Sequence, residues 1–322
     1  MNIYGRVSQL LSATMTLLAL VAMTTDAKAQ ITDTRTGNTQ VVLLGTGNPA
    51  PDPDRSGPAT AIVVNGSAYL VDFGPGVVRR ANAAVVDRGI KALEPTNLRV
   101  VFVTHLHSDH TVGYPDLIFS TWTIGRRVPL EVYGPKGTKA MTDHIIEAYR
   151  VDIETRTNAD GNQREFPDGY KVNAHEISAG VIYKDANVTV TAFPTRHAME
   201  SYGYRFDTPD RSIVISGDTS PTQATIDACR GCDVLIHEAN TLAWLAKRPP
   251  EFQAFAAKYH TTSMQLAELA TKAKPRLLIV YHASIALRPA VSSVASTPEE
   301  LLKEIQSRYA GKVVVGRDLD VY

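Results

Sequence analysis

Residues 100–110 read VVFVTHLHSDH, an apolar run that ends in a dense group of polar side chains. The β-branched and aromatic residues predict a buried strand. His105 and His107 are two residues apart, so they project from the same side of an extended backbone and can bind one metal ion. Asp109 and His110 fall in the turn beyond, where the chain can face a second metal. The segment therefore predicts a metal site at a strand end rather than a solvated turn.

Short apolar runs alternate with helix-like segments along the rest of the chain. The predicted strands are 40–45, 60–65, 67–74, 98–105, 129–134, 187–194, 202–206, 211–218, 232–238, 275–282 and 312–316. The predicted helices are 76–90, 137–150, 263–273 and 297–309. Gly89 is expected to end the first helix, and Thr297 with Glu300 to form a capping box in the last. Strands flanked by helices predict an α/β fold whose sheets are covered on their outer faces.

The sequence GTGNPA at residues 45–50 matches a nucleotide-binding pattern, Gly-x-Gly-x-x-Ala. That pattern works only where it opens a helix. Pro49, Pro51 and Pro53 cannot share a first helical turn, so the segment is expected to be a loop and no nucleotide cofactor is predicted.

The N-terminus has the pattern of a secretory signal peptide. Arg6 precedes an apolar stretch from about Leu10 to Met23, and Ala27-Lys28-Ala29 offers a small-x-small cleavage site. We expect residues 1–29 to be removed after Ala29, and residues 30–322 to form one domain in a bacterial periplasm or outside the cell. No membrane attachment is expected after cleavage.

Two cysteines are present, Cys229 and Cys232. One Cys-x-x-Cys pair cannot make a zinc site, although it can form a local disulfide in an oxidising compartment. The favoured interpretation is a helix end followed by a small buried residue at a strand start, ahead of a redox motif.

Further motifs give the chain a resemblance to the metallo-β-lactamase superfamily of hydrolases. Besides HLHSDH, the matching segments are VDFGPG with Asp72, FPTRHAMESYGYRF with His197, VISGDTSP with Asp218 and LLIVYHAS with His282. The resemblance covers nearly all of residues 30–322. It implies a four-layer αβ/βα sandwich whose metal site lies in a cleft at one edge.

The resemblance also implies a set of metal ligands. Implied are His105, His107 and His197 on one metal, Asp109, His110 and His282 on the other, Asp218 between them, and Asp72 orienting the metal-binding loop. Imidazole and carboxylate ligands suit two Zn²⁺ ions per chain, and Mn²⁺ or Fe fits the same set. A hydroxide shared by the two metals would attack the substrate.

SGDT, CDVLIHEA, YHTTSMQLAELA and LLIVYH resemble the ribonuclease Z and arylsulfatase-like branch. The similarity makes His260 a candidate for protonating the leaving group or for holding the anionic substrate, with Asp109 as the other catalytic candidate. The alternative for His260 is an N-terminal helix residue with Thr261 or Thr262 as the cap. His237 and Glu238 are expected to support the site rather than to touch substrate.

Charge and predicted export favour a small substrate. The 33 basic and 33 acidic residues balance, and the interval 152–171 holds five acids against three bases. Such a surface would repel a phosphate backbone. We therefore expect no nucleic-acid partner, a polar loop insertion at about 154–171, and a small anionic ester as substrate.

Three segments, 43–65, 71–81 and 132–145, most resemble those of secreted bacterial arylsulfatase-like enzymes. The prediction is accordingly an exported binuclear zinc arylsulfatase. A phosphodiesterase, including one for cyclic nucleotides, is the alternative, followed by a lactonase or β-lactamase-type hydrolase. A different class of function also stays open: iron redox chemistry, or a homologue that has lost its metals.

The oligomeric state stays open, with a homodimer as one option. Pocket walls are expected from Trp122, 154–171 and 241–259.

Overall fold

A computed structural model describes residues 38–288 and 295–322, and these residues belong to one compact unit. The predicted signal peptide, residues 1–29, lies outside the described residues, so it stays a prediction. Among the residues that are described, no helix is both long enough and apolar enough to cross a membrane.

The described residues form two mixed β-sheets. The first has the strand order β1 (Thr39–Gly45), β2 (Ala59–Val64), β3 (Ser67–Val71), β4 (Val100–Phe102), β5 (Leu130–Gly134) and β6 (Val172–Glu176). The second has the order β13 (Val313–Val315), β12 (Leu277–Tyr281), β11 (Val234–Glu238), β10 (Ser212–Ile215), β9 (Tyr202–Asp207), β8 (Thr189–Pro194) and β7 (Gly180–Lys184). Strands β3 to β6 are parallel, as are β10 to β13, and the remaining pairs are antiparallel.

Side chains alternate between two buried layers along each central strand. In β1, Val41 and Leu43 join a cluster with residues of the second sheet, such as Ile279, so they lie between the sheets. Val42 and Leu44 point the other way, into a cluster with helix residues. Because both faces of such a strand are buried, its sequence is a continuous apolar run rather than an alternating one.

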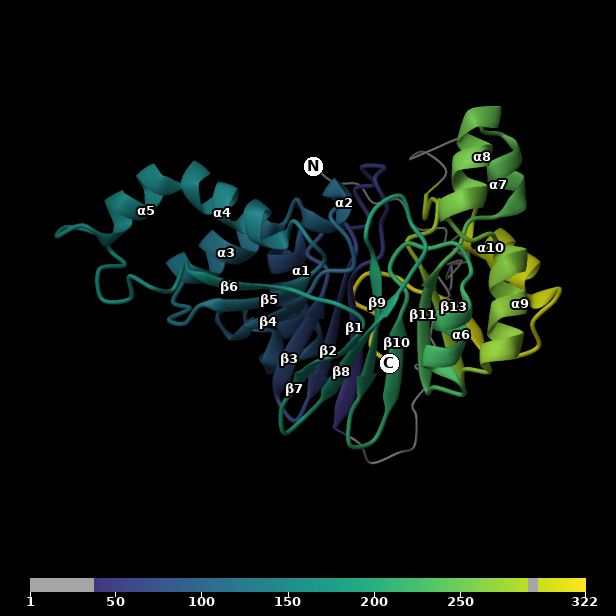
Figure 1. The fold of residues 1–322 in the computed structure, drawn as a ribbon, viewed down its shortest axis with the longest axis horizontal. Coiled ribbons are helices and arrows are strands. Elements are labelled where there is room, and N and C mark those ends of the chain that lie inside the picture. Colours follow the sequence, from purple (N-terminus) through teal and green to yellow (C-terminus); the bar gives the residue numbers. More distant parts are fainter. Residues whose placement is uncertain (1–37, 289–294) are drawn as a thin grey trace, which may run out of the picture. The chain divides into compact units, whose positions relative to one another are not determined.

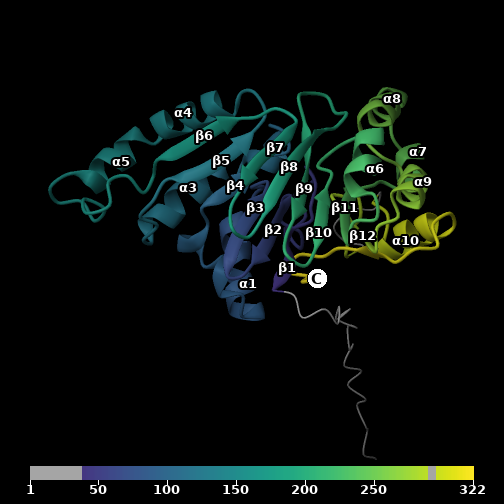
Figure 2. The same cartoon turned by 60° about the horizontal axis from the view of Figure 1, so that its bottom comes forward.

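Helices cover the outer face of each sheet (Figures 1 and 2). On the first sheet the cluster includes residues of α1 (Val77–Arg88) and α3 (Tyr114–Thr123). On the second sheet it includes residues of α6 (Gln223–Cys229), α9 (Ser263–Ala273) and α10 (Pro298–Gln306). The predicted α/β fold with four layers is confirmed.

Helix ends agree with the predicted capping residues. Gly89 follows α1 with φ of 71°, in the left-handed region that favours glycine. Thr297 and Glu300 form a capping box at the start of α10. Thr262 likewise caps α9, so His260 comes just before that helix.

Several elements escaped the predictions. Strands β6 and β7 were not expected, and the segment 241–259 contains helices α7 (Leu242–Ala246) and α8 (Pro250–Tyr259). Helix α4 (Thr138–Ala148) lies within the predicted range 137–150, and α5 (Arg150–Thr157) follows it. The polar segment 154–171 is therefore helical up to Thr157 and forms turns beyond.

A disulfide joins Cys229, the last residue of α6, to Cys232, which precedes β11. The favoured interpretation placed both residues as the structure does but omitted the bond, which had been left as an alternative. This pairing is the state that an oxidising compartment maintains.

Candidate metal centre

Four site residues follow strands that belong to the parallel parts of the two sheets. Asp72 follows β3, and His105 comes shortly after β4. Asp218 and His282 come after β10 and β12. Because the carboxyl ends of parallel strands meet at one edge of a sheet, each sheet delivers its polar side chains to one place. The His and Asp residues assembled there form overlapping groups, each with ligand atoms within 4.8 Å of one another: His105, His107 and His197; His105, His110 and Asp218; Asp109, His110 and His282; and His197, Asp218 and His260.

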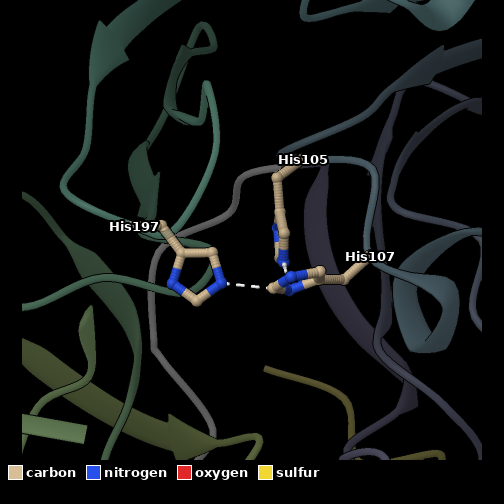
Figure 3. A group of neighbouring side chains, drawn as sticks. All are labelled: His105, His107 and His197. Atoms are coloured by element: carbon tan, nitrogen blue, oxygen red, sulfur yellow. Dashed lines mark hydrogen bonds between the residues drawn. The ribbon is translucent and has the colours of Figure 1, made fainter. Parts of the chain in front are cut away.

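Three imidazole rings converge in the first group (Figure 3). His105 Nε2 lies 3.1 Å from His107 Nδ1, which lies 3.0 Å from His197 Nε2. His197 comes from the loop after β8, whereas the other two follow β4, so the group joins both sheets.

The outer nitrogens of two of these rings are held by fixed partners. His197 Nδ1 lies 3.1 Å from the carbonyl oxygen of Tyr259, which can only accept, so Nδ1 carries the proton. Thr104 Oγ1 donates to Asp72 and thus accepts from His105 Nδ1 at 3.0 Å. In both rings Nε2 is left with a lone pair directed at His107.

The second group lies around Asp218. One carboxylate oxygen of Asp218 is 3.4 Å from His110 Nε2 and 3.4 Å from His282 Nδ1, and the other is 4.0 Å from His105 Nε2. His282 Nε2 is 3.0 Å from Asp109 Oδ2. Asp218 therefore lies between the two groups, in the position expected of a bridging carboxylate.

Tight backbone geometry accompanies this arrangement. Asp72 and His282 have φ of 62° and 50°, in a backbone region that residues other than glycine seldom adopt. A Cβ at Gly113 would lie 2.5 Å from the carbonyl oxygen of Gly74, so only glycine lets the turn after helix α2 (Ser108–Thr111) approach that segment. Strain of this kind persists where surrounding contacts fix the chain, as at functional sites.

Burial sets the charge of the three-histidine group. It lowers the pKa of His105 well below its usual value, and it lowers the pKa of His107 and of His197. Neutral imidazoles are the form that binds metals. Burial also opposes a charge on His110, but the carboxylates of Asp218 and Asp72 outweigh it and raise the pKa of His110. That corner of the site thus attracts positive charge.

The residues fit a pair of divalent cations. Neither His110 Nε2 nor Asp218 Oδ1 has a hydrogen-bond partner, although both atoms are buried. The converging lone pairs of His105, His107 and His197 likewise require a cation or a proton between them. Imidazole nitrogens around one point, with carboxylates shared beside them, form a donor set that Zn²⁺ prefers.

Half-buried His260 and buried Glu238 form an ion pair next to these groups. His260 Nδ1 lies 2.9 and 3.0 Å from the two carboxylate oxygens of Glu238, and 4.0 Å from Asp218. Burial of the imidazole works to lower the pKa of His260, yet Glu238 outweighs it and raises that pKa to about 9. Glu238 is completely buried and also accepts the backbone N–H of Thr219. The Glu238 carboxylate thereby favours the protonated form of His260.

His237 is not brought into the cluster. Its Nδ1 bonds the carbonyl oxygen of Glu238 at 2.7 Å, and it belongs to none of the ligand groups found among the described residues. Of the two residues expected to support the site, Glu238 is the one whose side chain is hydrogen-bonded to a site residue, His260.

Two cavities meet at the cluster. One of about 190 Å³ is lined by five site residues, including Asp218 and His260, and by Trp244, Phe252 and Phe255. A larger one of about 590 Å³ lies over the loop 48–57. Both are lined by Asp109, Asn48 and Pro49. Trp122 and residues 154–171 do not line either cavity, so of the three predicted walls only 241–259 is found there.

Thr104 is a site residue that sequence reasoning missed. Its N–H and hydroxyl both donate to the carboxylate of Asp72, at 2.8 and 2.9 Å, and its hydroxyl fixes His105. The available signal was a buried hydroxyl between an apolar strand and the first histidine, where a polar group must find a partner.

Comparisons with known proteins agree with this geometry. The model of the "Beta-lactamase superfamily domain" matches residues 68–283, more than half of the chain. The chain belongs to the metallo-β-lactamase superfamily. Its similar proteins include "Ribonuclease Z" of Mycobacterium bovis (strain BCG / Pasteur 1173P2), 30% identical over 285 residues that cover 87% of this chain and 96% of that protein. "Ribonuclease Z" of Mycobacterium sp. (strain KMS) is 35% identical over 249 residues, covering 76% and 83%.

Solved structures show the same fold. The metallo-beta-lactamase fold protein YhfI from Bacillus subtilis has a TM-score of 0.64 at 18% identity, covering 88% of this chain and 98% of its own. The short form of human tRNase Z has a TM-score of 0.62 at 21% identity, with coverage of 88% and 98%.

These relatives correct three predictions. The nearest resemblance to arylsulfatase-like enzymes is unsupported, and the predicted activity on small anionic esters, with arylsulfatase first, is wrong because the similar proteins are ribonucleases. The prediction of no nucleic-acid partner is wrong for the same reason. It rested on predicted export and on the charge of 152–171, a segment that does not line the cavities at the cluster. Sulfate monoesters and phosphodiesters are both singly charged tetrahedral anions, so the ligand set alone could not separate them.

The carboxylate of Asp72 gives a testable prediction about metal affinity. Asp72→Asn keeps the shape of the side chain but weakens its hydrogen bonds with His110 and Thr104, so zinc affinity should fall about 10- to 100-fold. Zinc titration against a competing chelator measures it. Asp116→Asn, which alters a surface partner of Arg79, is the matched control and should leave affinity unchanged. Equal affinity in wild type and Asp72→Asn would contradict the assignment.

Proposed function

We propose that the chain is a metal-dependent phosphodiester hydrolase that acts on RNA. The observation that carries this proposal is the position of His260, held by Glu238 beside Asp218, in a chain 30–35% identical to proteins named Ribonuclease Z. Hydrolysis of an RNA phosphodiester expels a poorly stabilised alkoxide, and a protonated imidazole at that point supplies the proton that the alkoxide needs.

The residues of the chain divide the metal-binding task between the two groups. His105, His107 and His197 would hold one ion, and Asp109, His110 and His282 the other, with Asp218 shared. When bound, two such ions neutralise charge on the phosphate oxygens and activate water.

We assign the proton transfers to two side chains that line the smaller cavity, His260 and Asp109. In this scheme a water oxygen forms the new bond to phosphorus, and the P–O bond to one nucleoside breaks. The leaving oxygen takes a proton from Nε2 of His260, the ring nitrogen not occupied by Glu238. Asp109, which lines both cavities, is placed to accept the proton that the attacking water loses.

The two cavities favour a substrate that continues on both sides of the reacting phosphorus. They share Asp109, Asn48 and Pro49, so a chain crossing the cluster would have one flank in each cavity. A polymer such as RNA uses both flanks, whereas a small ester would use one.

The direct test is cleavage of a labelled RNA hairpin with a single-stranded tail by the zinc-loaded full chain. Cleavage should appear, disappear with a chelator and return with added Zn²⁺. Asp218→Ala should abolish it while the circular dichroism spectrum stays unchanged. His175→Ala, an exposed histidine bonded to Glu131, should cleave like wild type. Hydrolysis of a lactam or lactone by a fully loaded protein that cuts neither RNA nor bis-p-nitrophenyl phosphate would overturn the proposal.

The role of His260 can be tested by changing the leaving group. His260→Ala should lower kcat by about 10²- to 10⁴-fold for RNA, whose leaving alkoxide needs a proton. The loss should be much smaller for bis-p-nitrophenyl phosphate, since p-nitrophenolate leaves without one. Glu238→Gln should lower both rates, as His260→Ala does. An equal loss on both substrates would mean that His260 binds the substrate rather than protonates it.

A further inference from the structure

An aromatic wall stands beside the metal cluster in the smaller cavity. We define it as Trp244 of α7 with Phe252 and Phe255 of α8. The rings contact one another in series: the centroids of Trp244 and Phe252 are 5.6 Å apart, and those of Phe252 and Phe255 are 6.2 Å apart. Phe252 and Phe255 keep 37% and 38% of their surface exposed. Large apolar side chains that stay exposed next to candidate metal ligands indicate a binding surface.

The wall lies next to His260, to which the proposed function assigns protonation of the leaving oxygen. The ring centroid of Phe255 lies 5.7 Å from that of His260. A group stacked on the wall is therefore attached to the leaving oxygen rather than to the oxygens that remain on phosphorus.

Two cations lie over aromatic rings in the same segment, 241–259. Arg248 lies over the ring of Trp244 and Lys258 over the ring of Tyr259, each 4.8 Å from the centroid. The segment 241–259 holds three basic residues and one acid, the opposite balance from 152–171. Aromatic rings together with cations form the kind of surface on which single-stranded nucleic acids stack their bases and neutralise their phosphates.

We infer that the aromatic wall binds the nucleobase of the nucleoside whose oxygen leaves, an inference that rests on the proposed function. The cavity of about 190 Å³ is smaller than the roughly 300–1,000 Å³ of sites for drug-sized ligands, so it takes one ring system rather than a folded dinucleotide. Every base has a π-face, so the wall selects for the presence of a base and tolerates its identity. Trp244, Phe252 and Phe255 are thus specificity residues for a nucleic acid over a simple phosphodiester.

The test compares two RNA hairpins that differ by one base. The terminal groups of the cleavage products identify the leaving nucleoside, and the second hairpin carries an abasic ribose at that position. With the intact RNA, Trp244→Ala should lower kcat/KM by about 5- to 150-fold, the range for loss of one base–aromatic stack. Wild type should lose a similar factor on the abasic RNA, and Trp244→Ala should lose nothing more there.

Two variants separate stacking from general damage. Trp244→Phe keeps an aromatic face and should retain most of the activity. Leu242→Ala removes an exposed side chain of the same helix that does not line the cavity, and it should act like wild type. The same loss for Trp244→Ala on both RNAs, or no loss on either, would overturn the inference.

A binding measurement keeps the inference testable if no RNA is cleaved. The chain has two tryptophans, and Trp122 is fully buried, so a quencher in the cavity reports on Trp244. Titration with adenosine 5′-monophosphate should quench wild-type fluorescence and leave the emission of Trp244→Phe unchanged. Quenching without RNA cleavage would refute the proposed function and retain the base site. Absence of quenching would refute the base site.

Discussion

Three hydrogen bonds converge on the carboxylate of Asp72, and the geometry of the metal centre depends on them. Two come from Thr104 at the end of β4, and the third comes from His110 Nδ1 on α2. The carboxylate thereby fixes the strand end relative to the helix, turns His110 Nε2 toward Asp218, and through Thr104 sets the ring of His105. Such partners decide which nitrogen of each imidazole is free to bind a metal.

Charge balance explains why these groups can stay together inside the protein. Burial lowers the pKa of His105, His107 and His197 and so favours their neutral forms, while Asp218 and Asp109 bring negative charge to their edge. Buried carboxylates are costly unless a cation or hydrogen bonds compensate them. Metal ions placed among these residues would supply that charge, and His260 beside them is compensated by the carboxylate of Glu238.

The sequence predicted the parts of the fold whose pattern is local. Continuous apolar runs such as VVLLG and LLIVY identify strands buried on both faces, and the polar residues directly after them identify the site edge. Thr297 with Glu300, and Gly89, determine their helix ends through contacts within a few residues. Strand β6, with the sequence VNAHE, carries largely exposed side chains and has no such pattern. Its position depends on pairing with β5, which is distant in sequence.

Substrate class was harder to predict, for a physical reason. Two cations held by these ligands would bind any suitable tetrahedral anion. Discrimination between substrates therefore depends on the side chains around the metals. Trp244, Phe252 and Phe255 lie 26 or more positions along the chain from Asp218, and nothing local shows that they share its cavity. The charge of 152–171 was misleading because that segment does not line either cavity at the cluster.

Anomalous diffraction from crystals of the zinc-loaded protein would locate the metal ions directly. Two zinc peaks per chain are expected. One should lie among His105, His107 and His197, the other among Asp109, His110 and His282, with Asp218 contacting both. A single peak, or zinc bound by residues outside these two groups, would contradict this assignment of ligands.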